Sequence, residues 1–443
     1  MKNCICVLDT CAWPIKFILF FFLTVSSPLH GQQPADTDVL HYDAEIEPNL
    51  LKKTIQGRVT ITGKLLGIVK KVAFDCGDLS IEKIQTKEKE LPFEVANNKV
   101  SIDVNGIDVK DPFEITIHYH GSPARGINFF PELEEVYTVF STSQWLVCKD
   151  RPDDKATLAL KVIFPSHLKA VASGNIQKQI RTQQNQTAIE WKLSDPSPTY
   201  TYGFAIGAFN EFVDSSANLT LRHLSADYTS TELAQIFADT RSMIRFFEER
   251  SGVPYPAKVY TQILGQGNVS QEMAGFTVMR LNYGKQVLAN ASEINLSAHE
   301  LAHQWWGNNV TCLSWNHFWL NEGFAVFMSS AYKEFKFGRE IYLKDISTYY
   351  DAYHAVVQKG LDKPLTFPNW INPTSDDRTL VYYKGAYILH LLREQIGEKA
   401  FWESVKQYTS TYFGKSVTAA DLRKVIEKVS GQDLGPFFSK WIE

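Results

Sequence analysis

The sequence predicts an α+β protein with an N-terminal all-β domain and a mainly helical C-terminal domain. Apolar and polar residues alternate with a period of two from about residue 41 to residue 210, which is typical of strands. After residue 210 the apolar residues recur with the period of an amphipathic helix. The chain has 443 residues, of which 44% are hydrophobic and 21% are charged, so it can form packed cores and is not a disordered chain.

The charge composition argues against some classes of partner. The formal net charge is −4, which argues against nucleic acid or an anionic membrane surface as the main partner. No apolar run reaches the roughly 20 residues that a helix needs to cross a bilayer. We therefore expect a soluble globular protein without a membrane span in the mature chain. The sequence makes no prediction of its oligomeric state.

Residues 1–32 are expected to be a signal peptide. Residues 17–25 form an apolar core, which follows Lys16 and precedes the small residues Ser26 and Ser27. This order of charge, apolar core and small residues is typical of secretory signal peptides, and the core is too short to span a membrane. We expect a secreted or periplasmic protein, with an uncleaved anchor as the alternative.

Cleavage of that segment would leave three cysteines, Cys76, Cys148 and Cys312. An odd number of cysteines cannot pair completely. The sequence leaves two outcomes open, which are one disulfide or three isolated buried thiols.

Residues 33–210 are expected to form the β domain. Turn signals such as Asp195-Pro196 separate many short alternating segments, and this pattern indicates an all-β layer. The alternating apolar residues are Tyr42, Ala44 and Ile46; Val59 and Ile61; Phe113, Ile115, Ile117 and Tyr119; Leu158, Leu160, Val162 and Phe164; and Tyr200, Tyr202, Phe204 and Ile206.

Residues 211–443 are expected to form the helical domain. A helix is predicted over 229–250, where Thr229 and Glu232 form a capping box and Gly252 lies just beyond the end. Further helices are predicted at about 291–306, at about 319–336, in three or four segments from residue 385 to the C-terminus, and from the cap formed by Thr418 and Asp421.

The segment that carries chemistry is residues 297–308, which read SAHELAHQWWGN. His299 and His303 are four residues apart, so on a helix both imidazoles project from one face and can share a metal ion. Glu300 lies beside the first histidine and can reach a water molecule at the metal without being a ligand. Asn290 with Glu293 forms a plausible N-terminal cap for this helix.

A third ligand is expected from the next helix. Eighteen residues separate His303 from Glu322, which lies in the string WLNEGFAVF. A second, antiparallel helix would bring this carboxylate beside the imidazoles, and catalytic zinc takes three protein ligands and an open position. We therefore expect one Zn²⁺ per chain on His299, His303 and Glu322. The alternative is that both histidines are packed core residues.

The strings HELAHQWWGN and WLNEGFA resemble the gluzincin zinc aminopeptidase family, which includes the membrane alanyl and puromycin-sensitive aminopeptidases. The similarity extends to VYYKGA at residues 381–386, to VCKDRPDDKA at 147–156 and to the strings TYTYGFAIGAF and LGPFFSKW. It covers about residues 40–443 and implies an N-terminal β-saddle domain followed by a thermolysin-like catalytic domain. The chain ends where this resemblance places the end of that domain, so we expect a short form without the family's C-terminal domains.

The resemblance also implies a mechanism. Zinc on His299, His303 and Glu322 would lower the pKa of a bound water molecule to about 7 and polarise the scissile carbonyl. Glu300 would act as general base and then general acid. Tyr382 would donate a hydrogen bond to the developing oxyanion.

The neighbouring Tyr383 would point about 100° away from Tyr382 on a helix. We therefore favour Tyr382 as the catalytic tyrosine.

One segment departs from the family pattern. Family members usually carry Gly-x-Met-Glu-Asn, whose glutamate binds the free α-amine of the substrate. Alignment of the methionines places Met273 on the family's methionine and Ala274 where that glutamate should be. Glu272 from a shifted position and Gln144 from the β domain are the other candidates for contact with the amine.

The sequence therefore predicts a zinc-dependent metallopeptidase that acts on peptides, with an aminopeptidase favoured. An endopeptidase, or an epoxide hydrolase like the leukotriene-processing branch of the family, is the second interpretation, and Ala274 favours it. The third is a non-catalytic peptide-binding module with a structural zinc.

Overall fold

The computed structural model describes residues 37–442, apart from residues 68, 106–111, 183, 368–369 and 371–372. Residues 36–443 form one compact unit. The predicted signal peptide, residues 1–32, lies outside the described residues. None of the helices formed by the described residues is long and apolar enough to cross a membrane.

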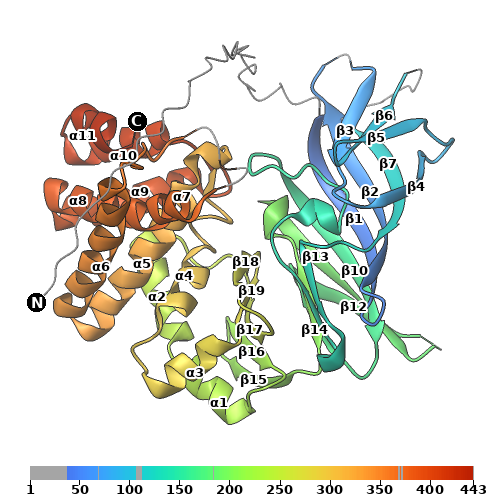
Figure 1. Cartoon of the computed structure of the whole chain (residues 1–443), viewed down its shortest axis with the longest axis horizontal. Helices are drawn as coiled ribbons and strands as arrows, with labels where there is room; N and C mark the ends of the chain where they lie inside the picture. The colour runs from blue at the N-terminus through green and yellow to red at the C-terminus, as the bar shows by residue number, and fades with distance from the viewer. Residues whose placement is uncertain are drawn as a thin grey trace, which may run out of the picture. The chain divides into compact units, whose positions relative to one another are not determined.

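The first half of this unit is built from strands, coloured blue to green in Figure 1. The strands are β1 (Thr37–Asn49), β2 (Thr54–Leu65), β3 (Lys71–Asp75), β4 (Ser80–Gln85), β5 (Phe93–Ala96), β6 (Lys99–Asp103), β7 (Phe113–Gly121), β8 (Ile127–Phe130), β9 (Glu135–Thr138), β10 (Lys155–Pro165), β11 (Lys169–Ala172), β12 (Asn175–Arg181), β13 (Gln186–Pro198) and β14 (Phe204–Gly207). They form a seven-stranded sheet in the order β12-β13-β10-β1-β2-β7-β4, a four-stranded sheet in the order β11-β14-β9-β8, and a three-stranded sheet in the order β3-β6-β5.

The period-two pattern has the expected structural cause. Along β10 every second side chain is buried, and Leu158, Leu160 and Val162 all enter the core of the β domain. The turn predicted at Asp195-Pro196 is wrong, because both residues lie inside β13. The register between β10 and β13 shifts next to them, and proline is tolerated in a strand at such an irregularity.

The second half opens with a five-stranded sheet, which the helical pattern of the sequence did not predict. Its strands are β15 (Asn210–Ser215), β16 (Thr220–Ser225), β17 (Val259–Gly265), β18 (Gln271–Met273) and β19 (Phe276–Arg280), in the order β15-β16-β17-β19-β18. The three-residue β18 is therefore an edge strand, antiparallel to β19. The domain boundary near residue 210 stays a prediction, and in the structure residue 210 is the first residue of β15.

Helices make up most of the remaining chain. They are α1 (Ser230–Ile236), α2 (Thr240–Ser251), α3 (Asn282–Ala289), α4 (Asn295–Ala302), α5 (Trp319–Phe337), α6 (Arg339–Gln358), α7 (Ser375–Thr379), α8 (Gly385–Ile396), α9 (Glu398–Tyr412), α10 (Ala419–Ser430) and α11 (Gly435–Trp441), with a π-helix η5 (Leu380–Lys384) between α7 and α8. The shorter elements are the 3-10 helices η1 (Pro131–Leu133), η2 (Thr142–Gln144), η3 (Thr199–Thr201) and η4 (Trp315–His317) and the strands β20 (Thr311–Cys312) and β21 (Ser416–Val417). This all-β domain followed by a mainly helical domain confirms the predicted fold class.

Two predicted helix caps are confirmed, one at Thr229 and one at Thr418 with Asp421 at the start of α10, but two other helix predictions differ. The capping box of Thr229 and Glu232 is present, but the predicted helix over 229–250 is two helices, α1 and α2. Asn290 and Glu293 do not begin the histidine helix, because Asn290 ends α3 and α4 begins at Asn295.

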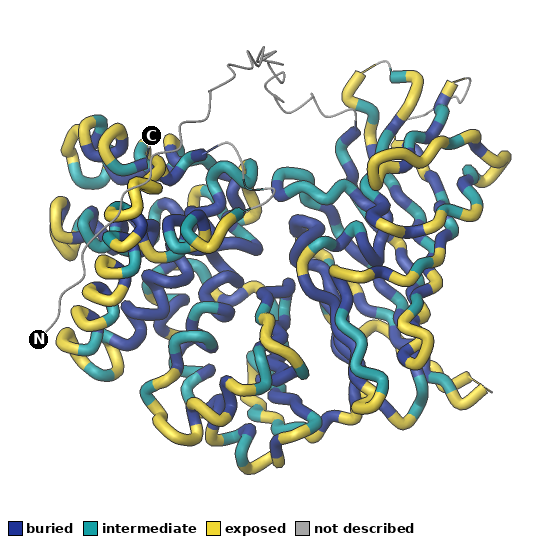
Figure 2. The backbone as a smooth tube through the Cα atoms, in the orientation of Figure 1, coloured by how far each residue is buried: buried dark blue, intermediate teal, exposed yellow. Residues whose placement is uncertain are grey.

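α5 is deeply buried within the helical half of the described chain. Every residue from Trp319 to Lys333 is buried, which Figure 2 shows as dark blue. A Cβ atom added to Gly323 would lie 3.0 Å from the backbone of Gly385, so α5 and α8 are in backbone contact. This contact holds the turn that carries Glu322 against the π-helix.

The three cysteines of the described chain are isolated thiols. Cys76, Cys148 and Cys312 are free and buried. Of the two outcomes that the sequence left open, the structure shows three isolated thiols.

Candidate metal centre

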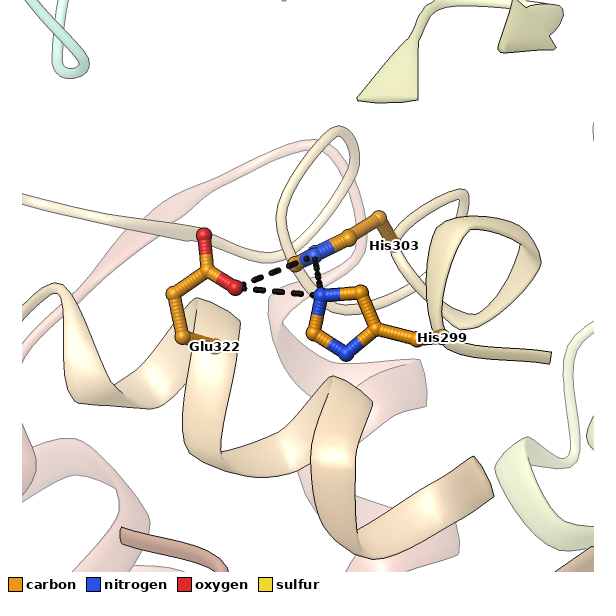
Figure 3. Close-up of side chains that lie close together, drawn as sticks. All are labelled: His299, His303 and Glu322. Carbon is orange, nitrogen blue, oxygen red and sulfur yellow. Dashed lines mark hydrogen bonds and ion pairs between the residues drawn. The ribbon is translucent and has the colours of Figure 1, made fainter. Parts of the chain in front are cut away.

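The structure brings together the three residues that the spacing predicts as metal ligands. His299 lies on α4, His303 directly follows the last residue of α4, and Glu322 lies in the first turn of α5. Figure 3 shows one carboxylate oxygen of Glu322 pointing at both imidazole rings. The distance from Glu322 Oε2 is 3.2 Å to His299 Nε2 and 3.4 Å to His303 Nε2, and the two nitrogens are 3.1 Å apart.

Local structure explains this convergence. The backbone of His303 keeps helical angles, with φ −57° and ψ −24°, so the four-residue spacing still places both rings on one face. The chain then turns back, and the backbone N–H of Asn308 donates to the carbonyl of His303 at 2.9 Å. The Asn321 side chain accepts a hydrogen bond from the backbone N–H of Cys312 at 3.0 Å and so ties this return segment to α5.

The donor atoms fit zinc. A tetrahedral ion with ligands at about 2.0–2.1 Å places its donor atoms about 3.3–3.4 Å apart, close to the observed spacing. His303 Nδ1 lies 3.0 Å from the carbonyl of Trp306, so its N–H donates there and Nε2 faces the other donors. Among the described residues, one group of three or more His, Cys, Asp or Glu side chains has all its possible ligand atoms within 4.8 Å of one another. This group is His299, His303 and Glu322. They form a possible zinc-binding group, in agreement with the predicted cofactor.

The pKa shifts of His303 and Glu322 also indicate that this group favours a bound cation. Burial lowers the pKa of His303, but Glu272 and Glu322 outweigh this effect and raise it to about 10. Burial raises the pKa of Glu322, but His303 and His299 outweigh it and lower the pKa to about 2. The carboxylates therefore favour positive charge between these side chains, which a divalent ion would supply.

Glu300 lies at the metal group without being one of the three ligands. It is 4% exposed, and its Oε2 has no hydrogen-bond partner among the described residues. Burial, followed by the nearby Glu272, raises the pKa of Glu300 well above its usual value. This buried carboxylate is thus suited to accept a proton.

Tyr382 contributes a hydroxyl from the π-helix. Its ring is stacked on that of His299 with a centroid distance of 6.0 Å, and burial, Glu322 and Glu272 raise its pKa well above the usual value. Tyr383 instead stacks on Tyr349 at 5.3 Å and is 39% exposed. The structure therefore brings Tyr382, and not Tyr383, to the metal group, in a helix type that often marks functional sites.

Glu272 reaches the site from the edge strand β18. Gln271 and Met273 on either side of it point away, because successive side chains of a strand alternate, and Met273 is fully buried in an apolar cluster. Glu272 is 4% exposed, and burial raises its pKa to about 7, a shift that Glu322 adds to and His303 opposes. The structure thus brings Glu272 to the ligands, whereas Ala274 is held by a hydrogen bond from its N–H to the carbonyl of Thr201 at 2.9 Å.

Gln144 is placed elsewhere. It lies in η2, and its side chain packs against Gly77 and Gly126 of the β domain. The structure does not bring it to Glu272. The β-domain residue that does reach the site is Tyr200, which sequence reasoning missed. It lies in the string TYTYGFAIGAF, which resembles the family but carries no spacing or charge pattern that marks a site residue.

Comparison with known proteins agrees with this geometry. Residues 39–201 match the family model described as "Peptidase M1 N-terminal domain", and residues 237–441 match the "Peptidase family M1 domain". The chain belongs to the peptidase M1 family. The resemblance drawn from the zinc motif is therefore confirmed.

Two M1 relatives show how far the chain has diverged in sequence from curated members of the family. "Aminopeptidase N" of Lactococcus lactis subsp. lactis is 26% identical over 434 residues, which cover 91% of this chain and 50% of the relative. "Probable aminopeptidase 2" of Sulfurisphaera tokodaii is 23% identical over 391 residues, which cover 84% of this chain and 49% of the relative. The chain spans about half the length of the curated relatives that it matches.

The fold of this M1 chain also occurs in a solved structure. The "M1 zinc metallopeptidase from Deinococcus radiodurans" superposes with a TM-score of 0.76 at 23% identity, covering 92% of this chain and 94% of that chain. The predicted architecture of an N-terminal β-rich domain followed by a mainly helical domain is therefore confirmed at the level of the fold.

We expect Glu322→Gln to lower the zinc content of the purified protein. The wild type should contain about one zinc per chain, and loss of the ligand charge should weaken binding by at least about tenfold. Metal analysis after dialysis at a fixed zinc concentration measures this. Glu394→Gln, which changes an exposed ion pair with Arg339, is the control and should keep its zinc. A wild type without zinc would contradict the assignment.

Proposed function

We propose that this M1 chain is a zinc-dependent metallopeptidase that hydrolyses peptide bonds and acts as an aminopeptidase. The observation that carries the proposal is the placement of Glu300, Tyr382 and Glu272 around one three-ligand metal group. A structural zinc site normally has four protein ligands and no catalytic groups around it. The arrangement therefore supports an enzyme over a peptide-binding module with a structural zinc.

The proposed chemistry divides among these side chains. His299, His303 and Glu322 would hold the zinc ion, which when bound would supply Lewis-acid polarisation of the scissile carbonyl and activation of water at neutral pH. Glu300 accepts a proton from the attacking water at its unpartnered carboxylate oxygen and then gives it to the leaving amine. The Tyr382 hydroxyl donates a hydrogen bond to the carbonyl oxygen as that oxygen gains negative charge.

Glu272 supports the choice of an aminopeptidase. Glu272 is 4% exposed, and no lysine or arginine among the described residues forms an ion pair with it. The protonated N-terminus of a peptide is a cation that would compensate this charge, whereas an internal segment of a longer peptide brings none. Relatives named aminopeptidase agree with this interpretation. The proposal therefore includes peptides with a free N-terminus as substrates, and an endopeptidase is not favoured.

Replacing Glu300 by glutamine tests the assigned base. Glu300→Gln should lower turnover by about 10²–10⁴-fold, because the amide cannot accept the proton. The zinc content should not change, since Glu300 is not a ligand. Glu293→Gln, in the turn before α4, is a control that leaves the metal group intact. Wild-type turnover by Glu300→Gln would remove Glu300 from the mechanism.

A blocked peptide tests the specificity. The wild type should cleave a peptide with a free N-terminus and leave its N-acetylated form intact, as measured by chromatography of the products. Glu272→Gln should raise the KM for the free peptide by about tenfold or more, because a charge-assisted hydrogen bond contributes about 1.5–3 kcal/mol. Equal cleavage of both peptides by the wild type would instead identify an endopeptidase.

We propose in addition that the chain is exported and is secreted or periplasmic. The support is the order of Lys16, the apolar core at residues 17–25 and the small residues that follow. N-terminal sequencing of the protein recovered outside the cytoplasm should find a start close to residue 33. Recovery of the chain only in the cytoplasm, with Met1 intact, would contradict export.

A further inference from the structure

Tyr200 is a β-domain residue that contacts both carboxylate-bearing elements of the metal centre. It lies in η3, between the long strand β13 and β14, and is 6% exposed. Its ring packs edge to face on Trp315 of η4, with centroids 5.3 Å apart. The residue thus reaches out of the β domain to the start of α5.

The hydroxyl of Tyr200 binds the residue next to the third ligand. Asn321 Nδ2 donates to Tyr200 Oη at 3.0 Å, and Asn321 Oδ1 accepts from the N–H of Cys312 at 3.0 Å. Asn321 is fully buried, so both ends of its amide need partners within the protein. The hydroxyl therefore helps to fix the turn of α5 from which Glu322 projects.

The backbone of the same tyrosine binds the residue next to Glu272. Gln271 Nε2 donates to the carbonyl of Tyr200 at 2.7 Å, and Gln271 Oε1 accepts from the N–H of Phe140 at 2.5 Å. The following residue, Thr201, accepts the N–H of Ala274 at 2.9 Å. η3 therefore holds the edge strand β18 at both ends.

Charge effects agree with this placement. Burial raises the pKa of the Tyr200 hydroxyl well above its usual value, and the carboxylates of Glu272 and Glu322 add to the shift. The contact of the hydroxyl that fixes its position is the hydrogen bond from Asn321, the residue before Glu322.

We propose that Tyr200 is a positioning residue that sets the relative placement of the zinc ligand Glu322 and the amine-binding Glu272. Its hydroxyl acts through Asn321 and its carbonyl acts through Gln271. The role given to Glu272 rests on the proposed function. The effect of Tyr200 on zinc binding through Asn321 and Glu322 does not depend on peptide hydrolysis. Residues that orient metal ligands in this way typically change metal affinity or activity by 10–100-fold when they are replaced.

The zinc-binding part is tested with Tyr200→Phe, which removes only the hydroxyl. The ring on Trp315 and the carbonyl to Gln271 remain, while Asn321 Nδ2 loses its acceptor. The dissociation constant for zinc, measured by competition with a chelating dye, should rise by about 10-fold or more. Tyr202→Phe is the matched control, because Tyr202 is buried in the same segment but its hydroxyl donates to the carbonyls of Ala156 and Ser197 inside the β domain. Its zinc affinity should stay at the wild-type value.

A double substitution separates positioning from general destabilisation. If Tyr200 acts through Asn321, Asn321→Ala should weaken zinc binding, and adding Tyr200→Phe to it should weaken binding no further. If the two substitutions lowered the zinc affinity additively, Tyr200 would not act through Asn321, and the proposal would be overturned. Should Tyr200→Phe not fold, Asn321→Ala still decides the matter, since an unchanged zinc affinity in that variant would overturn the proposal.

The amine-binding part is tested with Gln271→Leu. This variant loses the hydrogen bond to the Tyr200 carbonyl while the Tyr200 hydroxyl and the zinc ligands stay in place. The KM for a free-amine peptide should rise by about 10-fold while the dissociation constant for zinc stays unchanged. An equal loss of zinc affinity in Gln271→Leu and Tyr200→Phe would overturn the division of roles.

The outcomes also separate this inference from the proposed function. A wild type that binds zinc and cleaves no peptide would contradict the proposed function, and the zinc measurements would still test Tyr200. A Tyr200→Phe protein with the zinc affinity of Tyr202→Phe, in an active enzyme, would overturn only the inference.

Discussion

The metal centre of this protein brings three buried carboxylates close to two imidazoles. The negative charge of these carboxylates must be compensated, and the surrounding structure depends on that requirement. Glu272, Glu300 and Glu322 are each at most 4% exposed. Buried carboxylates repel one another unless protons or cations compensate them. Zinc and the N-terminus of a peptide are two cations that together would balance such a group. Charge compensation therefore links metal binding and substrate binding in the proposed enzyme.

No single element could assemble this group. α4 and α5 carry the ligands, a sheet edge carries Glu272, the π-helix carries Tyr382, and the β domain reaches in through Tyr200. The backbone contact between Gly323 and Gly385 fixes two of these elements against each other, because neither glycine has a side chain to keep them apart. The β domain is thus part of the construction of the metal centre and not only a neighbour of the catalytic half.

Sequence alone predicted the parts of the site that depend on local spacing. His299 and His303 follow from the helical repeat and Glu322 from the following helix, whereas Tyr382 follows from the resemblance of VYYKGA to the family's tyrosine segment. The edge strand β18 has three residues, too few to show a period, so alignment by methionine offered Ala274 where the structure presents Glu272. Tyr200 could not be predicted, because its partners Asn321 and Gln271 are 121 and 71 residues away. Contacts of that range depend on how the domains pack.

The reactivity of the three isolated thiols in the described chain can be used to measure local opening of the structure. Burial raises the pKa values of Cys76, Cys148 and Cys312, so these thiols stay protonated at neutral pH and are shielded from reagents. A thiol reagent then modifies each one only as fast as the structure around it opens. Cys76 and Cys148 lie in the β domain, whereas Cys312 lies in the return segment beside Asn321. The labelling rates at these positions can therefore distinguish opening of the β domain from opening of the metal centre, and no cysteine has to be introduced for the measurement.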